Sequence, residues 1–281
     1  METPKIIELF AACTLSKNAG WGNLVKEQYC PFIDRKCIKV RKSEPLISIG
    51  ICTVAYGKEK SNVIICPHRL TENNQIFLDC IHLLSLHEPG NELHIIPEIA
   101  VPGGSVDYIL ASVRDGKIKD FAGIELQTVD TTGSAWGYRQ SFLASKGLTL
   151  PDGNSAASFG INWKMTAKTI LVQMHHKITT FENLNKHLVL VLQDCLMHYM
   201  RNAFSFEHIS RVPKIGDSFH FHTYRLRANR NKYRLSLWER SSTDANGIAH
   251  CLGLKAEANI DLEVMVKMLE SKVSEKTLLR L

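Results

Sequence analysis

The sequence predicts a mixed α/β or α+β fold, in which helices and strands are interspersed without a regular βαβ order. The chain has 281 residues, of which 44% are hydrophobic, so it can bury a real core as one large domain or as one domain with a small appendage. Apolar runs of strand length and apolar runs with helical spacing both occur along the chain. A mixed sheet flanked by helices is therefore the expected architecture.

The N-terminal part of the chain combines strand-like runs with clustered cysteines. An opening helix is expected at "IIELFAA", followed by a glycine-containing loop. Short strand-like runs then appear at "SIGICTVAY" and "NVIICP", among four cysteines, and this suggests a small metal-stapled element. We expect residues 1–72 to form this N-terminal segment and residues 73–281 to form the core, as one compact unit.

The core segment contains its elements in mixed order. Helical spacing in "QIFLDCIHLLSL" predicts a helix, and "ELHII", "SVDYILASV" and "FAGIELQTV" then predict strands of a hairpin-rich sheet. Helices are expected at "MTAKTILVQMHHKITTF" and "NKHLVLVLQDCLMHYMRNAF". The run "FHFHTYRLRANRNKYRLSLW" alternates around a polar turn and predicts a hairpin, and a closing helix is expected from about Asp261.

Charge and cysteine content narrow the class of protein. The net charge of +6 is compatible with a polyanionic partner but too small to demonstrate one. Neither a leader nor an apolar run near the roughly 20 residues of a membrane span is visible, so we expect a cytoplasmic protein without a membrane partner. In a reducing compartment, the eight cysteines are better explained as metal ligands or core residues than as a disulfide framework.

Acidic residues on two neighbouring strands are the main candidates for chemistry. Side chains two apart on a strand share a face, so Glu125 and Gln127 project together while Ile124 and Leu126 face the other way. If the turn "RDGK" pairs the two strands, Asp107 and Glu125 converge and suit Mg²⁺. PD-(D/E)xK nucleases use this arrangement, usually with a lysine where Gln127 stands. Spacing alone favours a simpler interpretation, a turn cap at Asp107 and a solvated Glu125.

A resemblance that covers most of the chain changes this balance. The motifs "CPF", "CIK", "GIC" and "CPHR" are followed by "GNELHI", "SVDYILASV" and "GIELQTVDTTGS", and this order resembles the NotI family of type II restriction endonucleases. The stretches "TILVQMHHK" and "FHFHTYRL" resemble the family less specifically. The resemblance implies a PD-(D/E)xK core, Mg²⁺-dependent cleavage of both DNA strands at a specific site, a homodimer, and an iron bound by four cysteines.

The resemblance also implies roles for individual residues. Asp107 and Glu125 would hold the catalytic metal, and Gln127 would occupy the lysine position. Glu92 of "GNELHI" would be the additional acidic residue, with Glu98 ranked second because the distance from Glu92 to Asp107 matches the family. We hypothesise that the Gln127 amide holds a water by hydrogen bonds while Mg²⁺ supplies the acidity.

Four cysteines form the candidate structural metal site. Their spacing lacks the tight pairs of a zinc ribbon, and buried apolar thiols are the alternative explanation. Four thiolates suit iron or zinc equally, and only the resemblance favours iron. Such a site has no open position and would be structural. The four are Cys30, Cys37, Cys52 and Cys66.

Basic and aromatic side chains in four places are candidates for DNA contact. They lie beside the cysteines, after the catalytic strand, on one helix, and in the predicted hairpin. A basic β-ribbon can enter the major groove, but a solubilising surface hairpin explains the same residues equally well. The candidates are Arg35, Lys39, Tyr138, Arg139, Lys164, Lys168, Arg225, Arg227 and Arg230.

The expected partner is double-stranded DNA. One set of acidic residues is visible, so cutting both strands predicts a two-fold homodimer on a palindromic site. The resemblance further implies a GC-rich target and a cognate DNA methyltransferase in the same prokaryotic host. Two alternatives stay open: a repair or structure-specific nuclease of the same fold, and a non-enzymatic DNA-binding protein whose four-cysteine site senses metal or redox state.

Overall fold

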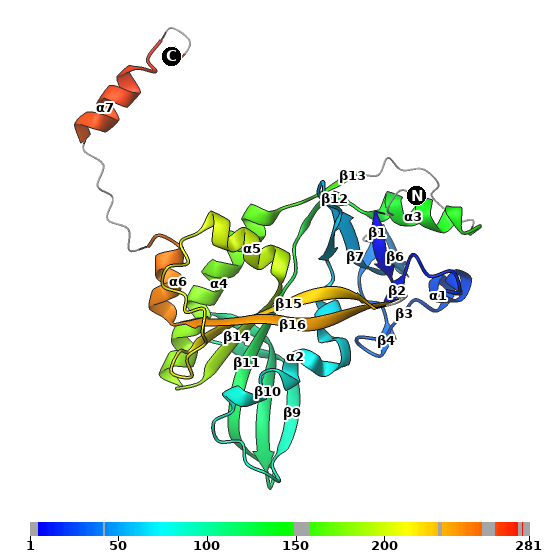
Figure 1. Ribbon diagram of the computed structural model, residues 1–281, viewed down its shortest axis with the longest axis horizontal. Helices are drawn as coiled ribbons and strands as arrows, with labels where there is room; N and C mark the ends of the chain where they lie inside the picture. The colour runs from blue at the N-terminus through cyan, green and yellow to red at the C-terminus, as the bar shows by residue number, and fades with distance from the viewer. Residues whose placement is uncertain are drawn as a thin grey trace.

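A six-stranded mixed sheet forms the centre of the fold, in the order β16-β15-β14-β11-β10-β9 (Figure 1). The strands β9, β10 and β11 form an antiparallel meander, β14 and β15 run parallel to β11, and β16 returns antiparallel to β15. The predicted mixed α/β class is confirmed. The strands are β9 (Glu92–Val101), β10 (Gly104–Arg114), β11 (Lys117–Gln127), β14 (His187–Gln193), β15 (Phe219–Asn229) and β16 (Lys232–Thr243).

The computed structural model describes residues 5–41, 43–148, 158–229, 232–254, 262–274 and 277. None of the helices in these ranges combines the length and apolar character that crossing a bilayer requires.

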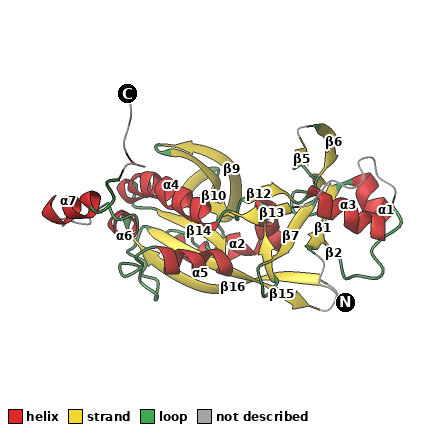
Figure 2. Ribbon diagram, turned by 90° about the horizontal axis from the view of Figure 1, so that it is seen from above, coloured by secondary structure: helices red, strands yellow, loops and turns green. Residues whose placement is uncertain are grey.

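Helical elements cover both faces of the central sheet. On one face, α4 contacts both α5 and α6. The view from above shows α5 and α6 near α4 (Figure 2). Side chains alternate along β14: Leu188 and Leu190 pack on this face, whereas Val189 and Val191 pack against α2 on the other face. The elements are η1 (Pro67–Asn74), α2 (Gln75–Leu78), η2 (Ile81–Leu83), α4 (Trp163–Asn183), α5 (Asp194–Ala203) and α6 (Ala245–Cys251), where η marks a 3₁₀ helix.

Burial on both faces explains why one helix prediction was half wrong. The run "HLVLVLQ" is strand β14, with every residue from Leu188 to Gln193 buried, and only the second half of the predicted helix is helical, as α5. A central parallel strand covered on both sides has a continuous apolar sequence, which spacing alone cannot distinguish from a buried helix. The predicted helix over Gln75–Leu86 is likewise broken into α2 and η2.

A second, four-stranded sheet with the order β2-β1-β7-β8 lies in the N-terminal part. The helix predicted at "IIELFAA" was wrong: Ile6–Leu9 is a fully buried strand, and Phe10 and Ala11 turn the chain with φ of 49° and 62°. The elements are β1 (Ile6–Leu9), β2 (Ala12–Cys13), α1 (Trp21–Glu27), β3 (Tyr29–Cys30), β4 (Arg35–Lys36), β5 (Val40–Arg41), β6 (Glu44–Ser48), β7 (Ile51–Tyr56) and β8 (Ser61–Ile64).

The remaining elements connect and extend these sheets. The hairpin predicted after Phe219 is confirmed as β15 and β16, and β16 reaches back to contact β2 and η1 (Figure 1). The predicted closing helix is α7, which has no buried residue. The elements are β12 (Thr131–Ser134), α3 (Trp136–Ser145), β13 (Ser158–Ile161) and α7 (Leu262–Glu270).

Candidate active site

The strands β10 and β11 bring the two predicted acidic residues to one place. Tyr108 pairs with Ile124 in the antiparallel register, and Asp107 and Glu125 are the next residues outward on the two strands. Ile124 and Leu126 pack in the hydrophobic cluster on the α2 face. Glu125 therefore projects to the opposite face, beneath α4, as the alternation of the strand predicts.

The two carboxylates lie close together, Glu125 buried and Asp107 half-buried. Oδ2 of Asp107 accepts a hydrogen bond of 2.8 Å from the backbone N of Leu126, and this bond fixes Asp107 beside β11. The side chain of Glu125 has Lys177 Nζ at 2.5 Å from its Oε1. The pKa of Glu125 is raised to about 7, because burial and the nearby charge of Asp107 raise it more than Lys177 lowers it.

Lys177 reaches this place from the buried side of α4. It follows Met174 and precedes Ile178 in the helix's buried stripe, and only 6% of its surface is exposed. The turn between β9 and β10 also touches α4 here, because a Cβ on Gly103, whose φ is 90°, would lie 2.7 Å from the backbone O of His176. Strand, turn and helix therefore meet around the Glu125 carboxylate.

Gln127 lies at the end of β11, on the same face as Glu125 by strand alternation. Its Nε2 donates a hydrogen bond of 2.5 Å to the backbone O of Thr128. The amide is thus directed to the chain that leaves the strand. As a neutral group, it contributes hydrogen-bonding capacity but no charge.

The structure separates the two candidates for the additional acidic residue. Glu92 pairs with Val113, six residues along β10 from Asp107, a separation of about 20 Å at the usual rise of a strand. Glu98 lies at the register position of Asp107, between the pairs on either side, and has a left-handed φ of 53°. The ranking of Glu92 above Glu98 is therefore not supported, because sequence distance did not reveal the register.

The four predicted cysteines converge in the N-terminal part. Their side chains line one cavity of about 10 Å³, and all four are buried. Burial raises the pKa of the Cys30, Cys52 and Cys66 thiols, whereas the ammonium of Lys39 favours the Cys66 thiolate. The four are Cys30, Cys37, Cys52 and Cys66.

The described residues contain no group of three or more His, Cys, Asp or Glu side chains arranged as ligands around one point. The donor chemistry nevertheless fits the metals that the motifs suggest. Four converging soft thiols suit a tetrahedral iron or zinc ion. Two neighbouring carboxylates suit a hard divalent cation, which would relieve the repulsion between Asp107 and Glu125.

Arg139, a candidate for DNA contact, is a buried structural residue. Only 1% of its surface is exposed, its Nε donates to the backbone O of Ile49 at 2.9 Å, and its guanidinium lies over the Trp136 ring. Burial lowers the pKa of Arg139 to about 10. The structure does not support a phosphate contact by this residue, because its side chain is enclosed.

The other candidate DNA-binding residues are scattered over the surface. Arg225 is paired with Asp194 at 2.6 Å, and Tyr138 packs edge-on against Phe159. Lys39 is half-buried and donates to the backbone O of Ile65. Arg230 lies outside the described residues. The candidates with exposed side chains are Arg35, Lys164, Lys168 and Arg227.

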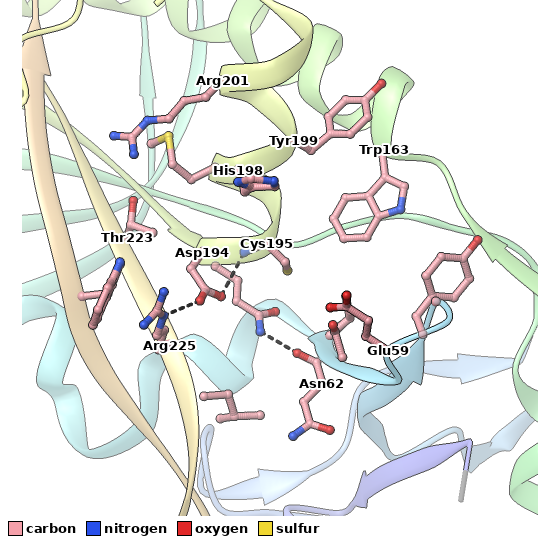
Figure 3. A pocket seen from close by; sticks show the side chains of 18 of the residues that line it. Glu59, Asn62, Trp163, Asp194, Cys195, His198, Tyr199, Arg201, Thr223 and Arg225 are labelled. Atoms are coloured by element: carbon pink, nitrogen blue, oxygen red, sulfur yellow. Dashed lines mark hydrogen bonds and ion pairs between the residues drawn. The ribbon is translucent and has the colours of Figure 1, made fainter. Parts of the chain in front are cut away.

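A groove of about 890 Å³ opens at the carboxyl end of β14, beside the middle of β15 (Figure 3). Trp163 and Tyr199 stack along it, and one of the dashed lines in Figure 3 joins Arg225 to Asp194. None of the described residues that line this groove belongs to the carboxylate pair. The groove is therefore separate from the candidate active site at Asp107 and Glu125.

Lys177 was not anticipated from the sequence. The available signal was a lysine at an apolar position of α4, since Ile170, Met174 and Ile178 of this helix are all fully buried. A buried lysine needs a partner, but the sequence does not reveal that this partner is Glu125, 52 positions earlier.

Comparison with protein families adds independent information. The family model described as "NotI: Restriction endonuclease NotI" matches residues 23–235, which is more than half of the chain. The match includes both carboxylates, the four cysteines and Lys177. No curated protein matches the chain.

Proposed function

Because the chain belongs to the NotI family of restriction endonucleases, a family of deoxyribonucleases that cut DNA at specific sites, we propose that it makes Mg²⁺-dependent cuts in both strands of a palindromic target. Asp107 and Glu125 are the proposed ligands of the catalytic ion. The observation that carries this proposal is their position, side by side on adjacent strands and repelling each other beneath α4.

The topology of the sheet supports a PD-(D/E)xK core. An antiparallel meander, β9 to β11, supplies both carboxylates, and α4 is the last element of the connection from β11 to the parallel strand β14. The acidic residues stand where neighbouring strand ends meet a helix. Such a constellation on rigid elements can hold a reacting group with little freedom to move.

The protein side chains have distinct roles in the proposed reaction. The hydrogen bond from Leu126 holds Asp107 in place, and Glu125 presents its carboxylate from the facing strand. Bound there, Mg²⁺ would lower the pKa of water and stabilise the charge that grows on the phosphate. Gln127 would orient water by hydrogen bonding, and Glu98, at the register position of Asp107, is now the better candidate for the additional acidic residue.

We also propose that the four cysteines hold a structural iron or zinc ion. Their convergence on one small cavity supports this, as does the position of Lys39 beside Cys66. Metal analysis of the purified protein should find about one ion per chain, lost in Cys52→Ser and retained in the control Cys251→Ser, whose thiol is buried in α6. Folded, active protein without iron or zinc would refute this assignment.

A homodimer is the assembly proposed for cutting two strands, because each chain supplies one pair of carboxylates. A GC-rich palindrome and a partner methyltransferase remain expectations from the family. Digestion of unmethylated phage DNA with Mg²⁺, followed by sequencing of the ends, tests the function. Discrete fragments with one common end sequence are expected, and uncut or randomly degraded DNA would contradict the proposal.

A further inference from the structure

Lys177 is the buried cation at the proposed reaction centre. Its ammonium lies 2.5 Å from Oε1 of Glu125, and both side chains have 8% of their surface exposed. A lysine is costly to bury unless a partner balances its charge. This buried pair therefore differs from an exposed ion pair, which would contribute little to stability.

Contacts between α4 and the turn before β10 hold Lys177 at this position. Oγ1 of Thr180 donates a hydrogen bond of 3.1 Å to the backbone O of Pro102, in the turn that leads into β10. Gly103 and Gly104 allow the turn to approach α4 closely, and a Cβ on Gly104 would lie 3.3 Å from the Lys177 side chain. The helix is thus fixed to the turn three residues before Asp107.

The charges at the centre do not balance without a further cation. Asp107 and Glu125 supply two negative charges when ionised, and Lys177 supplies one positive charge. Gln127 shares the face of Glu125 but adds no charge, and its amide nitrogen donates a hydrogen bond to the backbone O of Thr128. The helix therefore supplies an ammonium beside Glu125, whereas the strand supplies only an amide at position 127.

We propose that Lys177 is the positioning lysine of this active site, a role that its helix supplies because position 127 is a glutamine. The inference rests on the proposed function. Lys177 holds one oxygen of Glu125 and leaves the carboxylate directed towards Asp107. It also keeps a positive charge beside the centre, where negative charge grows during phosphodiester cleavage.

Replacing Lys177 with methionine should have two opposite effects. Cleavage should slow by about 100-fold, because Glu125 loses its fixed orientation and the centre loses a cation. The affinity of the DNA-free protein for Mn²⁺, measured by electron paramagnetic resonance, should increase by about tenfold, because a competing positive charge is gone. A merely structural lysine would weaken both, so this divergence identifies the role.

A relocated lysine provides the rescue. The double variant Lys177→Met with Gln127→Lys returns an ammonium to the same strand face and should regain at least about tenfold in cleavage. Lys177→Arg keeps the charge and should bind Mn²⁺ within about threefold of the wild type. The matched control is Lys186→Met, which breaks another lysine and carboxylate pair outside the site, between half-buried Lys186 and buried Asp120 at 2.6 Å.

The outcomes separate the two proposals. Thermal unfolding and DNA binding in Ca²⁺ confirm that each variant is folded. If the wild type cuts DNA and folded Lys177→Met cuts within about threefold of the wild-type rate, the role of Lys177 is overturned and the proposed function is left intact. The same conclusion follows if the double variant Lys177→Met with Gln127→Lys cuts no faster than Lys177→Met. Equal losses in Lys177→Met and Lys186→Met overturn it as well. Wild-type protein that fails to cut overturns the proposed function and this inference together.

Discussion

The two ends of strand β11 carry buried carboxylates in contrasting environments. Near the start of the strand, Asp120 accepts hydrogen bonds from Lys186 at 2.6 Å and from the backbone N of Leu86 at 2.8 Å and of Phe121 at 2.9 Å. Burial by itself would raise the pKa of Asp120, but these donors outweigh it and lower the pKa. This carboxylate is fully satisfied.

At the other end, Glu125 also has a lysine but faces a second carboxylate. Burial and the charge of Asp107 together raise the pKa of Glu125 to about 7 in spite of Lys177. The same pairing of side chains thus gives opposite shifts, and the difference comes from the neighbours. A balanced pair stabilises the fold, whereas surplus negative charge is the feature expected of a cation site.

The largest predicted difference between the two ends concerns cleavage. Glu125→Ala should reduce Mg²⁺-dependent cutting by about 10³-fold or more, because a proposed metal ligand is removed. Its DNA affinity in Ca²⁺, measured by gel shift, should stay close to that of the wild type. Asp120→Asn is the matched change and should cut at the wild-type rate per folded molecule. Full cleavage by Glu125→Ala would remove the distinction.

Stability should respond in the reverse order. Asp120→Asn should lower the free energy of unfolding by about 2 kcal/mol at pH 7, because the half-buried ammonium of Lys186 loses its ionic partner. Urea unfolding measures this loss.

The pH dependence of that difference follows from the lowered pKa of Asp120. The stabilisation of the fold by ionised Asp120 is fully present above pH 3.8, the ordinary pKa of this group, and is lost as the pH falls through its lower pKa in the folded protein. The two proteins should therefore converge in stability below pH 3.8. A difference that stays constant down to the acid limit would show that Asp120 stabilises the fold without its charge.

The smallest predicted effect is a gain in stability at the proposed site. Asp107→Asn keeps an oxygen that can accept from the backbone N of Leu126 and removes the repulsion against Glu125. In protein freed of divalent metal, unfolding should require about 1 kcal/mol more than for the wild type. Cleavage should be lost in the same variant. A lower melting temperature in calorimetry would mean that the carboxylates do not repel.

The sequence predicted the local part of this site correctly. The turn at Asp115 and Gly116, with φ of 53° and 69°, has the left-handed geometry that an Asp-Gly pair favours. Strand alternation then places Glu125 opposite the buried Ile124, as expected. These features depend on residues close together in the chain, so short-range patterns suffice to reveal them.

The missed features depend on long-range packing. The apolar spacing of β14 and of Ile6–Leu9 predicts helices, but both segments are strands whose residues are buried on both faces. The register between β9 and β10, which places Glu98 beside Asp107, is not visible in the sequence. The approach of Lys177 to Glu125 likewise depends on how α4 crosses the sheet.

The most direct measurement of the central proposal is an anomalous difference map from crystals of the protein soaked in Mn²⁺. The account predicts a peak about 2.0–2.2 Å from one carboxylate oxygen of Asp107 and one of Glu125, the range in which hard divalent ions bind oxygen. A fully occupied Mn²⁺ peak at other ligands, with these two carboxylates bare, would contradict it.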